Sequence, residues 1–137
     1  MSDANLGADR GLTLGVGLFE TVLALDGQPV LWDAHLARLA RGCAALGLPE
    51  PDPLACRIAI DEALAALGAQ RAAVRLSWTG GDGRRGLDAP DTPQPRLIVK
   101  ATASAPPPSS LRLALSTVRR NPTSPTSRLK TLSSLDQ

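Results

Sequence analysis

Aromatic residues are scarce in this sequence of 137 residues, which has one Phe, two Trp and no Tyr. Such a chain lacks the aromatic platforms on which nucleic-acid bases stack. Its net charge of +2 gives no strongly basic surface for nucleic acid or for an anionic membrane. No apolar run is long enough to span a bilayer, and residues 1–10 lack the apolar core of a signal peptide. We therefore expect a soluble, cytoplasmic protein without a nucleic-acid or membrane partner.

Cysteine is scarce as well, with two residues, Cys43 and Cys56. Both fall within segments of helical periodicity. Two cysteines so placed are typical of small buried hydrophobic side chains, and they indicate neither a disulfide framework nor a metal site. We expect no bound metal.

Two strands are predicted near the amino terminus, after a polar segment over residues 1–10 that we expect to fray. Residues 18–25 are rich in β-formers. Asp26-Gly27 is a hairpin turn signal, and residues 30–32 would form the returning strand.

Two helices are predicted next. The first covers residues 33–46, with Asp33 as its N-cap and Gly47 at its end. The second begins at Asp52-Pro53 and ends at Gly68. We expect the apolar side of this second helix to consist of Leu54, Ile58, Ala65 and Leu67.

Strand patterns return after the helices. Residues 72–78 alternate, with Val74, Leu76 and Trp78 on one side and Arg75 and Ser77 on the other. A loop rich in Gly and Arg covers residues 79–87, and residues 97–102 form the next predicted strand. Three prolines make residues 104–110 a semi-rigid linker, and residues 111–118 alternate as a further strand.

This order predicts an α+β fold, because the helices are segregated from hairpin-like strands. We expect a small domain over residues 1–103, with an antiparallel sheet and two helices. The linker over residues 104–110 would lead to a second, truncated domain. That domain would begin at residue 111 and contribute its first strand within residues 111–137.

Lysine is the scarcest cation, because Lys100 and Lys130 are the only lysines among 15 Lys and Arg residues. A desolvated lysine can lose its proton and act as a nucleophile, whereas an arginine cannot. Alone, a lysine near the end of a chain is most often a solvated charge. Lys130, however, opens the segment Lys-Thr-Leu-Ser-Ser-Leu-Asp-Gln. This segment resembles the lysine segment of aminodeoxychorismate lyases, which are fold-type IV enzymes dependent on pyridoxal phosphate (PLP).

Three upstream motifs resemble the same family in the same order. Residues 9–12 read Asp-Arg-Gly-Leu, and residues 15–21 read Gly-Val-Gly-Leu-Phe-Glu-Thr. Residues 35–39 match a His-x-x-Arg-Leu motif, and residues 85–87 match the Arg-Gly-Leu of a glycine-rich loop. Two positions depart from the pattern, since Val16 replaces a usual Asp and the loop's first arginine is missing near Thr79.

The resemblance implies a role for each matching residue. Lys130 would form the Schiff base with PLP and act as the catalytic acid and base. Arg38 would bind the cofactor phosphate, which suits the planar fork of a guanidinium. For His35 the sequence leaves two roles open, packing or support of a residue that binds the cofactor. Phe19 and Arg85 would contact substrate. The family also implies a homodimer.

The implied reaction converts 4-amino-4-deoxychorismate to 4-aminobenzoate and pyruvate in folate biosynthesis. Two alternatives remain open. One is a D-amino acid or branched-chain aminotransferase on the same scaffold, and the other is a non-catalytic domain that packs or dimerises. The resemblance covers about half of a usual family member, so we expect this chain alone to be inactive.

Overall fold

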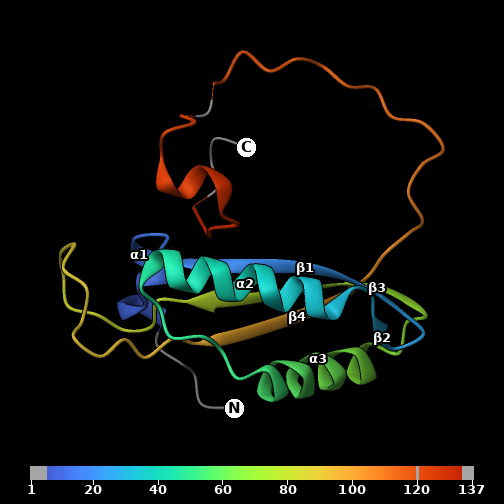
Figure 1. Cartoon of the computed structure of the whole chain (residues 1–137). Helices are drawn as coiled ribbons and strands as arrows, with labels where there is room; N and C mark the ends of the chain where they lie inside the picture. Colours follow the sequence, from blue (N-terminus) through green and yellow to red (C-terminus); the bar gives the residue numbers. More distant parts are fainter. Residues whose placement is uncertain (1–5, 120, 134–137) are drawn as a thin grey trace.

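A computed structural model of the chain describes residues 6–119 and 121–133. Its centre is one four-stranded antiparallel sheet with the strand order β2-β1-β3-β4 (Figure 1). The strands are β1 (Gly17–Leu25), β2 (Gln28–Pro29), β3 (Arg71–Thr79) and β4 (Leu97–Ala103). The helices are η1 (Leu6–Ala8), α1 (Arg10–Thr13), α2 (Trp32–Leu46), α3 (Pro53–Leu67) and η2 (Pro125–Arg128). The predicted α+β class and antiparallel sheet are confirmed.

The two long strands, β1 and β3, pair along their whole length, from Gly17 opposite Thr79 to Leu25 opposite Arg71. Because side chains alternate along a strand, this register divides the residues of each strand between two faces. Helices α2 and α3 both cover the same face of the sheet. The predicted division of β3 is confirmed, since Val74 and Leu76 are buried and Arg75 is exposed.

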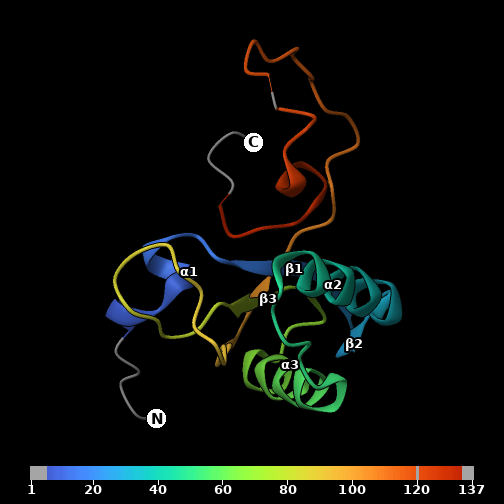
Figure 2. The ribbon, with the colours of Figure 1, turned by 60° about the vertical axis from the view of Figure 1, so that its left-hand side comes forward.

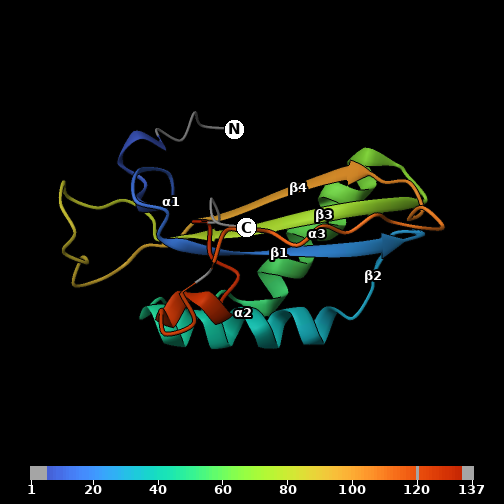
Figure 3. The same ribbon diagram turned by 90° about the horizontal axis from the view of Figure 1, so that it is seen from above.

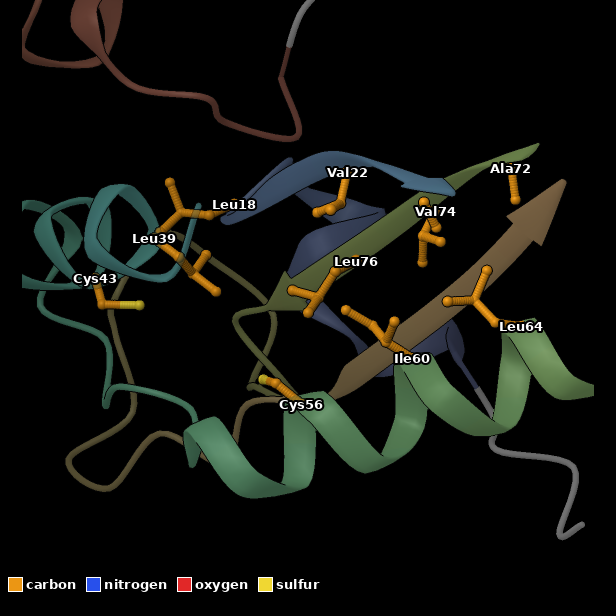
Figure 4. Packing of buried hydrophobic residues seen from close by; sticks show 11 residues of the cluster. Leu18, Val22, Leu39, Cys43, Cys56, Ile60, Leu64, Ala72, Val74 and Leu76 are labelled. Carbon is orange, nitrogen blue, oxygen red and sulfur yellow. The ribbon is translucent and has the colours of Figure 1, made fainter. Parts of the chain in front are cut away.

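The hydrophobic core fills the space between this face and the two helices (Figure 4). Both cysteines belong to it as free, fully buried thiols, as the sequence predicted. Burial raises the pKa of each thiol to about 11, so both stay protonated at neutral pH. The buried core residues are Leu18, Val22, Ala24, Leu39, Cys43, Cys56, Ile60, Leu64, Ala72, Val74 and Leu76.

The buried side of α3 differs from the prediction. Cys56, Ile60 and Leu64 face the core, whereas Leu54 and Ile58 are exposed. Apolar residues occur around this whole helix, so periodicity alone fits more than one side. Packing against β4 and β3 selects the side that is buried.

The turn region after β1 also corrects the prediction. The returning strand is β2 at Gln28–Pro29, not residues 30–32, because α2 already begins at Trp32. Asp33 lies in the first turn of α2 and is not its N-cap. The cap position is Leu31, which has a left-handed backbone and makes no capping hydrogen bond through its side chain.

The strand predicted over residues 111–118 does not form. Residues 104–119 contain no helix or strand, and they leave the sheet in a long arc (Figures 1 and 2). Leu111, Leu113 and Leu115 are exposed along it. The alternation is present in the sequence, but a strand needs a neighbour to pair with its backbone groups, and no described segment pairs with this one. The domain boundaries at residues 103 and 110 stay predictions.

The far end of the arc returns to the sheet through η2. Seen from above, α1 and the β3–β4 connection project beyond the end of the sheet at which β1 begins (Figure 3). No helix of the described residues is long and apolar enough to cross a membrane. Nor do residues 6–119 and 121–133 contain a metal-type cluster of three His, Cys, Asp or Glu side chains.

Candidate active site

Residues 130–132 pair with the first residues of β1. The Phe19 amide donates to the Lys130 carbonyl at 2.9 Å, and the Leu132 amide donates to the Gly17 carbonyl at 3.0 Å. These bonds occupy the part of the β1 edge that the short strand β2 leaves open. Gly17 has a φ of 151°, and a Cβ there would lie 2.6 Å from the Trp78 carbonyl oxygen and 2.7 Å from Leu132 Cδ1, so this position requires glycine. Backbone pairing therefore fixes Lys130 beside Phe19.

The amine of Lys130 lies over the aromatic ring of Phe19. Its Nζ is 4.0 Å from the ring centroid, and Arg75 Cζ is 3.8 Å from the same centroid. Both cations are therefore within the range of cation–π attraction. The predicted residues Phe19 and Lys130 are brought together, and Arg75 joins them from β3.

This environment makes the amine easier to deprotonate. Partial burial lowers the pKa of Lys130, and the positive charges of Arg38 and Arg75 lower it further against the opposing effect of Glu20. The neutral form is the one that attacks a carbonyl or accepts a proton. Within the described residues, Lys130 has no ion-pair partner that would hold its proton.

A buried carboxylate, Glu20, binds two side chains of α2. His35 Nδ1 lies 2.7 Å from Glu20 Oε2, and Arg38 Nε donates to Oε1 at 2.7 Å. Arg38 Nη2 donates to Oε2 as well, which completes a bidentate pair. Glu20 lies on the helix-covered side of β1 and is 2% exposed, so these bonds replace the water that its charge has lost.

Both carboxylate oxygens of Glu20 accept charge-assisted hydrogen bonds. Burial raises the pKa of this carboxyl, but the bonds from Arg38 and His35 outweigh burial and hold the pKa below its usual value. The same bond raises the pKa of Arg38. Because an ionised carboxylate only accepts, His35 Nδ1 must carry a hydrogen and donate it.

Arg38 keeps donor capacity after binding Glu20. Its Nε and Nη2 are engaged, whereas its Nη1 makes no hydrogen bond within the described part of the chain. The side chain is 48% exposed, so it can meet a second anion from solution. Glu20 thus fixes one edge of the guanidinium and leaves the other for a ligand.

The role of Glu20 was not predicted from the sequence, although the residue lies inside the motif at residues 15–21. A signal was available. An acidic residue at an inward-facing position of a strand needs a buried cation, and the next helix offers His35 and Arg38 one turn apart.

Arg85 is not in contact with the other predicted site residues. It is exposed on the β3–β4 connection, and none of the bonds or ring contacts of the described residues joins it to Lys130, Phe19 or Arg38. With Arg84, Thr13 and Leu14 it lines a hollow of about 340 Å³. Its predicted role toward substrate stays a prediction.

Comparison with known proteins identifies the family. The family model "Amino-transferase class IV" matches residues 17–137 of this chain. The chain belongs to the class IV aminotransferases. Its fold, a small antiparallel sheet with two helices on one face, is also that of the solved members described next.

Two class IV relatives that resemble the chain are lyases by name. A bifunctional aminodeoxychorismate lyase/D-amino acid transaminase of Mycobacterium tuberculosis is 36% identical over 101 residues, which is 68% of this chain and 34% of that protein. A crystal structure of 4-amino-4-deoxychorismate lyase from Pseudomonas aeruginosa matches with a TM-score of 0.80 and 35% identity. That match covers 94% of this chain and 48% of the solved one.

A third relative is described as an aminotransferase with its cofactor. It is a hypothetical aminotransferase of Mycobacterium tuberculosis in a PLP-bound form, with a TM-score of 0.55 and 28% identity over 70% of this chain and 32% of that one. The class IV family is one of PLP-dependent enzymes. The chain spans between a third and a half of the length of these relatives.

Proposed function

We propose that this chain is part of a PLP-dependent lyase that converts 4-amino-4-deoxychorismate to 4-aminobenzoate and pyruvate. The observation that carries the proposal is the placement of Lys130, whose amine lies on Phe19 beside Arg75 with a lowered pKa. The names of the relatives at 35% and 36% identity support the substrate.

The residues present fit PLP in two respects. Lys130 offers an amine that can react with the cofactor's aldehyde, and Arg38 offers its free Nη1 to the phosphate while Glu20 holds the rest of the guanidinium. When bound, PLP supplies an electron sink for the carbon that carries the substrate amine. We propose Lys130 and Arg38 as its cofactor-binding residues.

Lys130 Nζ would move the protons of this reaction. The two products together contain all the atoms of the substrate, so the enzyme needs no oxidant and no water. The ring loses one proton and the departing pyruvyl group gains one, so the number of protons does not change overall. One amine that takes and returns a proton is sufficient for both steps.

A D-amino acid aminotransferase is the second candidate. The Mycobacterium tuberculosis relative carries both activities in its name, which favours testing them together. The reactions differ in what they require, because a transaminase needs a keto acid as acceptor and the lyase does not. A non-catalytic role finds less support, since the chain belongs to an enzyme family.

Borohydride reduction tests the role of Lys130. A full-length protein containing this chain is loaded with PLP, reduced and digested, and the modified peptide is identified by mass spectrometry. We expect the label on Lys130. Lys100 is the matched control, because it is the other lysine of the chain. Label on Lys100, or on neither lysine, would refute the assignment.

Product analysis separates lyase from transaminase. We expect 4-aminobenzoate and pyruvate in equal amounts without an added keto acid, and loss of both products in Lys130→Ala but not in Lys100→Ala. Turnover that depends on a keto acid acceptor, with a D-amino acid as donor, would favour the second candidate. A homodimer and a cytoplasmic location, both expected from the sequence, also remain proposals.

A further inference from the structure

The side chain of Arg10 lies inside the glycine-rich connection between β3 and β4, and it bonds to Gly86, which is 76 residues away in the sequence. The residue is only 5% exposed. Its Nη1 donates to the Gly86 carbonyl at 3.3 Å, and its Nη2 donates to the Leu87 carbonyl at 3.0 Å. Both carbonyls flank Arg85 on its C-terminal side, so one guanidinium binds the backbone that carries Arg85.

The first residues of the loop, 81–83, are bound by backbone groups of residues 8–10. The Arg10 amide donates to the Gly81 carbonyl at 2.8 Å, and the Gly83 amide donates to the Ala8 carbonyl at 3.1 Å. A Cβ at Gly83 would lie 2.5 Å from Arg10 Cδ, so the loop touches the stem of the side chain. The loop therefore wraps around Arg10 from residue 81 to residue 87.

Asp9 anchors this arrangement to the sheet. It is 1% exposed, and its carboxylate accepts from the Gly11 amide at 2.7 Å and from Thr79 Oγ1 at 2.8 Å. Arg96 lies 3.4 Å from the same carboxylate and 2.6 Å from Asp82. The prediction that residues 1–10 fray is therefore wrong for Asp9 and Arg10. Both are buried and attach this segment to the sheet and the loop.

Arg84 and Arg85 lie on the outside of the wrapped loop. Both are exposed, and in the described part of the chain neither has an ion-pair partner. Their position is therefore set by the backbone, and Arg10 binds that backbone on both sides of them.

We propose that Arg10 is a positioning residue that holds the loop so that Arg85 presents its guanidinium to an anionic substrate. This inference rests on the proposed function, because it takes the loop as a border of the substrate site. Two donors in a rigid fork suit two successive carbonyls, whereas a lysine at this position would reach one of them at a time.

Hydrogen exchange tests the hold on the loop without any activity measurement. We expect amides of residues 83–88 to exchange about tenfold faster or more in Arg10→Met than in the wild type, while β1 and β3 keep their protection. Arg41→Met, on the exposed side of α2, is the matched control and should change neither. Unchanged exchange of the loop in Arg10→Met would overturn the proposal.

A double-mutant cycle tests the link to Arg85 in the full-length enzyme. Arg85→Ala should raise KM about ten- to hundredfold, the effect of losing one charge-assisted hydrogen bond, with kcat less affected. Arg10→Met should raise KM similarly, and the double variant should be no worse than Arg85→Ala alone. Additive losses would show that Arg10 acts independently of Arg85 and would refute the positioning role.

Gly83→Ala covers the case in which Arg10→Met fails to fold. It keeps the charge of Arg10 but places a methyl group against its stem, so we expect faster loop exchange and a raised KM. Normal loop exchange in Gly83→Ala would count against the proposal. If the wild type has no lyase or transaminase activity, the proposed function fails, whereas the exchange measurement still decides whether Arg10 holds the loop.

Discussion

At the scale of single residues, one buried carboxylate fixes the two α2 side chains of the candidate site. Glu20 is held in the sheet by β1, and its two oxygens bind Arg38 and His35 on α2. The ion pair between Glu20 and Arg38 serves two purposes. It satisfies the buried charge of Glu20, and it fixes the direction of the half-exposed Arg38 side chain. A group held in this way loses less entropy when it binds a ligand.

Removing the charge of Glu20 should destabilise the protein. Glu20→Gln is expected to lower the free energy of unfolding at neutral pH by about 1.5–3 kcal/mol, the range for hydrogen bonds to charged groups. Urea denaturation measures this loss. Glu62→Gln, on the exposed side of α3, is the control and should stay within about 0.5 kcal/mol of the wild type.

The same variant predicts a pH dependence. The pKa of Glu20 is lowered in the folded state, so its contribution is complete above the ordinary glutamate pKa of about 4.3 and is lost as pH falls through the lowered value. The stability difference between the wild type and Glu20→Gln should therefore be constant near pH 7 and shrink in acid. A difference that grows in acid would show that Glu20 is not the ionised partner.

The amine of Lys130 should respond to the charge of Arg75. Arg75 lowers the pKa of Lys130, so Arg75→Gln should move that pKa up toward its usual value. Acylation of Lys130, followed by mass spectrometry across a pH series, gives the midpoint directly. Arg71→Gln, at the first residue of β3, serves as the control. An unchanged midpoint in Arg75→Gln would mean that the charge of Arg75 does not contribute to the lowered pKa of Lys130.

At the scale of elements, the two helices begin in different ways. Asp52 caps α3 by accepting from the Leu54 amide at 2.9 Å, with Pro53 as the first helical residue. The first turn of α2 contains Asp33, but its cap position is Leu31 with a φ of 55°. The turn after β1 forces this start, because the chain must reverse within a few residues.

Two aspartates therefore give a paired test of capping. Asp52→Ala should cost about 0.5–2 kcal/mol of stability, the usual cost of losing an N-cap. Asp33→Ala should cost less, since only its interaction with the helix dipole is removed. Thermal or urea unfolding of both variants measures the difference. Equal losses would show that capping by Asp52 contributes nothing beyond its charge.

At the scale of the whole molecule, the chain is a packed sheet-and-helix layer joined to a long exposed arc. The arc leaves at β4 and returns where residues 130–132 pair with β1 (Figures 1 and 2). Its return places Lys130 on the sheet although residues 105–118 contact little of it. The candidate site therefore depends on two attachments far apart in the sequence.

Hydrogen exchange should distinguish the exposed arc from the packed sheet. Amides of residues 105–118 should exchange within seconds, because no strand or helix protects them, whereas β1 and β3 should be the slowest. The amide of Leu132 should be slower than those of the arc, because it donates to Gly17. Slow exchange throughout residues 111–118 would mean that this segment is paired after all.

The sequence by itself determined the three longer strands β1, β3 and β4, both long helices and the family, because these depend on local periodicity and short motifs. Tertiary structure alone decided which side of α3 is buried, since Ile58 and Ile60 are equally apolar and only packing against β3 and β4 distinguishes them. It also decided that residues 111–118 form no strand. The site divides in the same way. Motifs identified Lys130 and Arg38 as candidates, whereas the contacts of Glu20, Arg75 and Arg10 join residues up to 77 positions apart, which local patterns do not encode.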